Sequence, residues 1–109
     1  MVLLLNEATF PPEQTSNVGQ AYADWLKENP PDPSIEKELG IGVLNTEDGN
    51  MLSIGMGDIV KGKVEEVLKR TTQQNLFIAN KVEGFKFKTK VILNYTEVYE
   101  ILGITAPEV

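Results

Sequence analysis

The chain has 109 residues, of which 41% are apolar and 24% are charged, a composition typical of one soluble globular domain. Its net charge of −6 argues against binding to nucleic acid or to an anionic membrane surface. It contains neither cysteine nor histidine, which excludes disulfides, thiol nucleophiles, and metal or haem sites built on thiolate or imidazole. We therefore expect no cofactor and no metal, and any general base would be a carboxylate, a lysine or a tyrosine.

The first ten residues, MVLLLNEATF, hold an apolar run that is too short for the h-region of a signal peptide, and no basic residue precedes it. No segment has the length of apolar sequence that a bilayer-spanning helix needs. We expect a cytoplasmic protein with no membrane partner.

The first half of the chain predicts a strand, a helix and a hairpin. Residues 2–10 predict a strand that the following proline pair ends. Residues 13–29 predict a helix, which the proline-rich connector NPPDPS then stops. Residues 35–45 and 50–59 predict two strands, and the Asp48-Gly49 dipeptide predicts a two-residue turn between them. The helix has an apolar stripe at helical spacing, formed by Val18, Ala21, Tyr22, Trp25 and Leu26.

The second half predicts a helix, a strand and a short helix. Residues 59–82 predict the helix, with Asp58 as its N-cap. The polar run TTQQN weakens the middle of this helix, so the sequence does not decide whether the helix is continuous. Residues 85–95 predict a strand that alternates apolar residues with three lysines. Residues 96–103 predict a short terminal helix, and residues 104–109 a loose tail.

The predicted order is therefore β-α-β-β-α-β with one extra helix. This is the α+β, ferredoxin-like arrangement, an antiparallel sheet with its two long helices on one face. We expect a single domain over residues 1–103. The sheet face that the two long helices leave uncovered is called the open face below.

The stretch SIGMGDIVKGK, residues 53–63, resembles a phosphate-binding loop. The dinucleotide fingerprint requires a third glycine where this chain has Val60, and the P-loop requires a hydroxyl residue where it has Val64. Asp58 would also place a negative charge where the anion docks. The sequence therefore argues against phosphate binding and for another role of the glycines.

The residue pairing between the two predicted hairpin strands indicates what the glycines do. With a two-residue turn, Gly42 pairs with Gly55 and Gly40 with Gly57, and directly opposed residues share one face of a sheet. These four glycines and Ser53 would form a bare patch on the open face, as the floor of a ligand cavity or as a close contact with another backbone. A loop with an odd number of residues would break this pairing. The opposite, core-facing side would then carry Leu39, Ile41, Val43, Leu52, Ile54 and Met56.

The sequence does not decide which alternate side chains of the first strand face the helices and which face the open side. Either Leu4 and Asn6 or Leu5 and Glu7 line the open face. In the second case Glu7 lies beside the lysines of the late strand, and Glu7 and Lys88 become candidate ligand-binding residues. The lysines should point away from the helices on an edge strand, where they either prevent edge-to-edge aggregation or form a cationic wall for an anionic ligand.

Three segments carry a resemblance to a known class of proteins. The NPPDPS connector after a helix, the GIG strand and the late KFKTKVILNYTEVYEILG segment are similar to the dimeric α+β-barrel proteins, and more specifically to a small family of uncharacterised proteins with this fold. In that superfamily the open sheet faces of two chains pack together, so the resemblance implies a homodimer. Its members include cofactor-free monooxygenases, haem-degrading enzymes, chlorite dismutases and sensors. The haem-using members rely on histidine, which this chain lacks.

Three functional hypotheses follow from these observations. The first is a non-enzymatic homodimer with a small-molecule site over Gly40, Gly42, Gly55 and Gly57, together with the side chains named above. The second is a cofactor-free enzyme that uses a carboxylate, a lysine or a tyrosine as its acid or base. The third is a protein-interaction subunit that binds through its edge strand or terminal helix.

Overall fold

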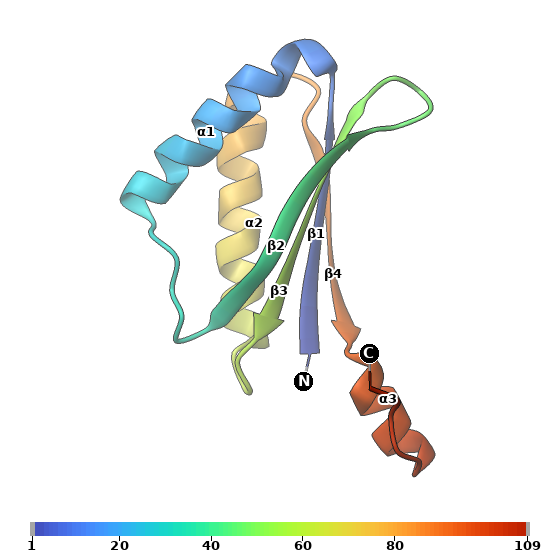
Figure 1. The fold of residues 1–109 in the computed structure, drawn as a ribbon. Helices are drawn as coiled ribbons and strands as arrows, with labels where there is room; N and C mark the ends of the chain where they lie inside the picture. Colours follow the sequence, from blue (N-terminus) through green and yellow to red (C-terminus); the bar gives the residue numbers. More distant parts are fainter. Residues whose placement is uncertain (1, 109) are drawn as a thin grey trace.

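The computed structural model describes residues 2–108, and its elements are named in Figure 1. The strands are β1 (Val2–Phe10), β2 (Glu36–Asn45), β3 (Met51–Ile59) and β4 (Lys86–Leu93). The α-helices are α1 (Thr15–Glu28), α2 (Val64–Lys81) and α3 (Tyr95–Leu102), and a 3₁₀ turn, η1 (Pro12–Gln14), precedes α1. No helix among these is long and apolar enough to cross a membrane.

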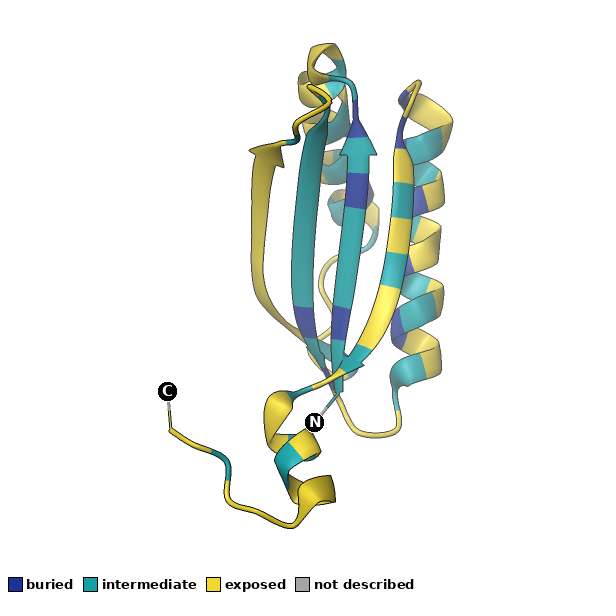
Figure 2. Ribbon diagram, turned by 90° about the vertical axis from the view of Figure 1, so that its right-hand side faces the viewer, coloured by how far each residue is buried: buried dark blue, intermediate teal, exposed yellow. Residues whose placement is uncertain are grey.

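The four strands form one antiparallel sheet in the order β2-β3-β1-β4. Helices α1 and α2 lie side by side on one face of this sheet, and within residues 2–108 no element covers the other face (Figures 1 and 2). The predicted ferredoxin-like α+β class is therefore confirmed. Helix α3 projects beyond the end of the sheet at which β1 begins (Figure 1).

Two details of the long helix differ from the prediction. Strand β3 runs on to Ile59, where Asp58 pairs with Leu3 and Lys37, so Asp58 belongs to the sheet and is not an N-cap. The helix begins only at Val64, after a turn in which Gly62 has a φ of 82°. From there it is continuous to Lys81, so the TTQQN run does not break it.

The core lies between the sheet and the two long helices. Its residues show which side chains of β1 face the helices. Leu4, Ala8 and Phe10 are buried on the helix-facing side. Leu5 and Glu7 therefore lie on the open face, which is the second of the two alternatives. The buried apolar residues form two separate clusters, one of Ala8, Phe10, Ala21, Ile78, Val82 and Phe85, the other of Leu4, Ile59 and Val67.

The β2–β3 hairpin corrects the predicted turn. The Thr46 amide donates to the Asn50 carbonyl oxygen at 2.9 Å, and the Gly49 amide donates to the Thr46 carbonyl oxygen at 3.0 Å. The loop therefore has three residues rather than two, and Gly49 supplies the positive φ that such loops need at their end. The Asp48 carboxylate holds the turn by accepting from the Asn50 amide at 3.1 Å.

This one-residue difference changes the face that the two glycines of β3 occupy. Gly42 pairs with Ile54 and Gly40 with Met56, whereas Gly55 pairs with Ile41. Gly40 and Gly42 lie on the open face as predicted. The placement of Ser53, Gly55 and Gly57 there is wrong, because the three face the helices, and Leu52, Ile54 and Met56 take the open face instead.

The turn geometry makes a testable prediction. We expect Gly49→Ala to lower the free energy of unfolding by about 1 kcal/mol, because a non-glycine residue is strained at a φ of 88°. The measurement is urea-induced unfolding followed by circular dichroism. Gly19→Ala inside α1 is the matched control: an added Cβ meets nothing within 4 Å, and alanine should raise stability by about 0.5–1 kcal/mol. A stabilising effect of Gly49→Ala would contradict the three-residue turn.

Candidate ligand groove between the helices and the sheet

A groove lies between the two long helices and the sheet. Its wide half has a volume of about 240 Å³ and its narrow half about 110 Å³. The two halves adjoin, because both are lined by Asn6, Tyr22, Ile41, Gly55 and Gln74. We call this space the helix-side groove.

Two glycines of β3 form the floor of the groove. A Cβ added at Gly55 would lie 3.7 Å from Ile41 Cγ1, so a methyl group fits there while a larger side chain would enter the groove. A Cβ added at Gly57 would lie 2.7 Å from Glu36 Cδ, so glycine is what allows the Glu36 side chain to lie across the strand. The four glycines predicted to form one bare patch are thus divided between the two faces, and on the helix side only Gly55 is left uncovered, because the Glu36 side chain lies over Gly57.

Two side-chain amides pair in the wall of the wide half. Asn75, on α2, is only 1% exposed, and its Nδ2 donates to Asn6 Oδ1 at 2.8 Å. Asn6 Nδ2 donates back to Asn75 Oδ1 at 3.3 Å, and the Thr89 hydroxyl donates to Asn6 Oδ1 at 3.1 Å. Buried amides need such partners, and this polar layer separates the two apolar clusters of the core.

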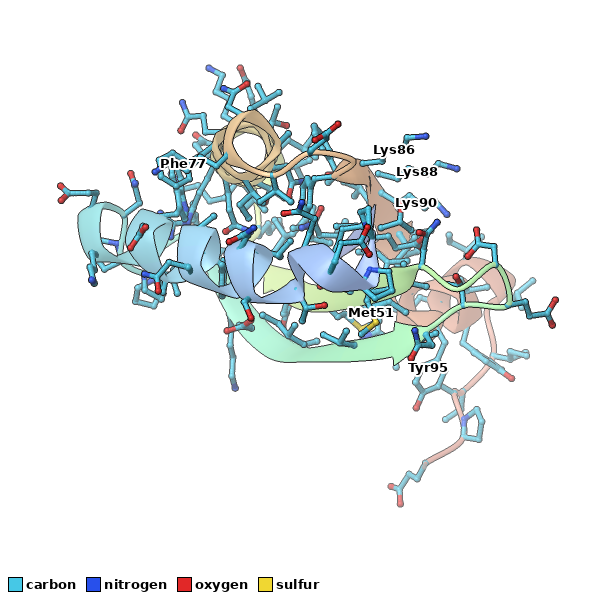
Figure 3. All side chains as sticks on the ribbon, turned by 90° about the horizontal axis from the view of Figure 1, so that it is seen from above. Met51, Phe77, Lys86, Lys88, Lys90 and Tyr95 are labelled. Atoms are coloured by element: carbon cyan, nitrogen blue, oxygen red, sulfur yellow. The ribbon has the colours of Figure 1, made fainter. Side chains whose placement is uncertain are left out.

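Sequence reasoning missed this network. The available signal was the spacing of Val67, Thr71, Asn75 and Ile78, which places an asparagine on the buried stripe of the helix. Trp25 was predicted to pack in the core, and it is buried, with its ring 5.6 Å from that of Phe77 on α2. Figure 3 shows Phe77 on the side of α2 next to α1.

The narrow half of the groove is charged. Glu36, Glu38, Asp32 and Arg70 all line it. The Arg70 Nη2 donates to the Asn29 carbonyl oxygen at 2.7 Å, and the Asp32 carboxylate accepts from the Ser34 amide at 3.0 Å. Among the described residues, no donor is hydrogen-bonded to the carboxylate of Glu36.

Burial shifts the proton affinity of two groups in the groove. It raises the pKa of the Glu36 carboxyl, the neighbouring Glu38 carboxylate raises it further, and Arg70 opposes the rise. Burial likewise raises the pKa of the Tyr22 hydroxyl, again with a contribution from Glu38. Tyr22 is therefore a hydroxyl donor at neutral pH, and the Glu36 carboxyl group takes up a proton at a higher pH than an ordinary glutamate does.

The remaining predicted site residues lie elsewhere. Glu7 and Lys88 are register partners on the open face, and Glu7 Oε1 lies 3.5 Å from Lys90 Nζ. Lys86, Lys88 and Lys90 form a row on the edge strand β4 and point away from both helices, as predicted (Figure 3). The seven predicted site residues thus divide into two sets on opposite faces, with Ser53, Gly55 and Gly57 in the groove and Gly40, Gly42, Glu7 and Lys88 outside it.

A metal site is a separate question. In the described part of the chain, no group of three or more acidic side chains is arranged to hold a metal ion.

Solved structures share this fold at low sequence identity. A designed protein, Foldit4, aligns with a TM-score of 0.55 at 7% identity over 85% of this chain and 97% of that one. An antibiotic biosynthesis monooxygenase aligns with a TM-score of 0.51 at 11% identity over 86% of this chain and 98% of that one. The C-terminal domain of MgtC from Mycobacterium tuberculosis aligns with a TM-score of 0.51 at 10% identity over 83% of this chain and 88% of that one.

These likenesses establish the ferredoxin-like α+β fold. No protein-family model matches the sequence, and a search of curated proteins found no match. Because a designed protein and a monooxygenase share the arrangement, the fold itself carries no function, and the function must be argued from the groove and the open face.

The raised pKa of Glu36 predicts a pH dependence of stability. Because its folded-state pKa lies above the ordinary value of 4.5, the folded state binds the proton more tightly than the unfolded state. The contribution of the Glu36 carboxyl group to the stability of the fold is therefore greatest below pH 4.5, and it declines as the pH rises from there through the folded-state pKa. We expect Glu36→Gln to unfold at a higher urea concentration than the parent protein at pH 7, with the difference shrinking toward pH 4.

Urea unfolding at both pH values measures this difference. Glu83→Gln, at an exposed position, is the control and should change the free energy of unfolding by less than about 0.5 kcal/mol. A Glu36→Gln variant that is less stable than the parent at pH 7 would show that the carboxylate is stabilised by its surroundings, contrary to this prediction.

Proposed function

We propose that the protein is a small-ligand-binding domain that acts as a homodimer, with the ligand in the helix-side groove and the dimer contact on the open face. The observation that carries the proposal is the bare floor at Gly55, above which the groove remains open between α1, α2 and the sheet. Together the two halves of the groove are comparable with the smallest small-molecule pockets, which begin at about 300 Å³.

The lining of the groove supports ligand binding. Small-molecule sites are mostly apolar and contain a few polar groups that orient the ligand. The wide half has this character, and at its junction with the narrow half lie Tyr22 and Gln74. Within residues 2–108 neither the Tyr22 hydroxyl nor the Gln74 amide has a hydrogen-bond partner, so both are available to a ligand.

Binding is favoured over catalysis by the surroundings of Glu36, the carboxyl group in the groove whose pKa is raised. A catalytic acid or base is usually oriented by a hydrogen bond to a second group. In the described residues Glu36 has no such partner, and the chain has no histidine or cysteine that could act in its place.

The open face supports the proposed dimer. Six apolar side chains lie on it without any covering element in the described residues: Leu3, Leu5, Leu52, Ile54, Met56 and Ile92. Contiguous apolar surface of this kind is typical of an interface. Helix α3, beyond the end of the sheet, offers a second exposed apolar surface, since its Ile101 is 75% exposed and a helix of eight residues depends on packing for its stability.

Ligand binding can be tested with 4-phenylbutan-1-ol, a neutral probe with an apolar body. NMR titration of the ¹⁵N-labelled protein should shift the amides of Asn6, Tyr22 and Gln74, with a dissociation constant on the order of 1–10 mM for a ligand of this size. Gly55→Val should weaken binding at least about tenfold, because its methyl groups enter the groove. Gly42→Val, on the opposite face of the sheet, is the matched control and should leave binding unchanged. The absence of shifts in the groove would overturn the proposed ligand site.

The dimer can be tested by light scattering. At micromolar concentration we expect twice the single-chain mass of 12.1 kDa. Ile54→Asp should convert the protein to a monomer, because its cross-strand partners are Glu7 and Gly42 and the new carboxylate would be buried unpaired in the proposed contact. Leu76→Asp makes the same change at an exposed position of α2 and should leave the dimer intact. A monomeric parent protein would refute the proposed assembly without affecting the groove.

A further inference from the structure

The two halves of the helix-side groove differ in chemistry. The wide half is lined by aliphatic and aromatic side chains from α1, α2 and the sheet, among them Val18, Ile78 and Phe85. The narrow half carries the charges. A molecule that fills both halves must therefore be amphipathic, with its polar end in the narrow half.

The charges of the narrow half are unbalanced. Three carboxylates line it against one guanidinium, that of Arg70. Arg70 is held by the Asn29 carbonyl oxygen at 2.7 Å, and the Asp32 carboxylate is engaged by the amide of Ser34 at 3.0 Å. Glu36 and Glu38 remain as acceptors, so the narrow half is an anionic site within a protein whose net charge is −6.

A β-bulge directs these two carboxylates into the groove. The register of β2 shifts between Glu38 and Gly40, so that Leu39 is the extra residue. Before the bulge the even-numbered residues Glu36 and Glu38 face the helices, and after it the odd-numbered residue Ile41 does. Bulges re-aim side chains in this way, and here two carboxylates and an apolar side chain come to line one groove.

The half-buried Glu36 carboxylate lacks a hydrogen-bond partner in the described residues. Its side chain lies across Gly57, at a place where any larger residue would displace it. The carboxylate is half-buried and, within residues 2–108, accepts no hydrogen bond. Removing a carboxylate from water without a partner is unfavourable, and a cationic group on a ligand would supply that partner.

We infer that the helix-side groove binds an amphipathic primary amine, with its apolar body in the wide half and its ammonium group in the narrow half, against Glu36 and Glu38. This inference rests on the proposed function of the groove as a ligand site. At the junction of the halves, Tyr22 and Gln74 can hydrogen-bond to polar atoms in the middle of the molecule. An anionic head is disfavoured, because the single guanidinium already has a partner and the carboxylates repel it.

Three probes with one apolar body and different heads test the inference: 4-phenylbutylamine, 4-phenylbutan-1-ol and 4-phenylbutyrate. NMR titrations of the intact protein at pH 7 and low ionic strength should give about tenfold tighter binding of the amine than of the alcohol, with the carboxylate weakest. The advantage of the amine should decline at about 0.5 M salt, because the ammonium–carboxylate attraction is screened.

Glu36→Gln assigns the effect to the narrow half. It should bring the amine to within about twofold of the alcohol, since the bond between ammonium and carboxylate is lost, and it should weaken the uncharged alcohol much less than the amine. Glu83→Gln, at an exposed site, removes the same charge from the chain and should preserve the advantage of the amine. The dispersion of the amide signals in the NMR spectrum of the variant shows whether it is folded.

The outcomes separate this inference from the function on which it rests. Binding of the alcohol in the groove with no advantage for the amine would overturn the inference and leave the proposed function intact. An amine advantage that survives both Glu36→Gln and Glu38→Gln would also overturn it, because the charge recognised would lie elsewhere. Failure of all three probes to shift groove amides would overturn the proposed ligand site itself.

Discussion

The pairing of two amides in the middle of the core is the interaction on which the rest of the structure depends. Asn6 on β1 and Asn75 on α2 each donate to the other, with Thr89 as a third member. An asparagine buried at this depth requires a partner, so Asn6 must face the helices. Because neighbouring residues of a strand point to opposite faces, Glu7 is then placed on the open face. The same polar layer divides the apolar core in two and lies along the wall of the groove.

The two faces of the sheet consequently carry different surfaces. On the helix side, the glycines of β3 and the bulge in β2 leave a groove that is apolar at one end and anionic at the other. On the open side, an apolar patch adjoins the row of lysines on β4. A ligand in the groove and a second chain on the open face would therefore not compete for the same residues, which is why the two proposals can fail independently.

The fold explains where such sites can lie but not what they bind. A designed protein and a monooxygenase have the same arrangement of strands and helices at low identity to this chain. The character of the groove comes from local features: Gly57 lets a carboxylate lie on the sheet, and the extra residue Leu39 allows Glu36 and Ile41 to face the same side. These features give the narrow half of the groove its charge.

The sequence by itself determined the order and type of the elements, because hydrophobic periodicity and glycine or proline punctuation are local signals. The alternation of residues 85–95 also determined that the lysines point away from the helices, as they do. Only the tertiary structure decided which face Gly55, Gly57 and Glu7 occupy. Side chains in a strand alternate with a period of two, so a hairpin loop of three residues instead of two, or one bulge, reverses every assignment beyond it. The partner of Asn75 was equally hidden, because it lies 69 positions away along the chain.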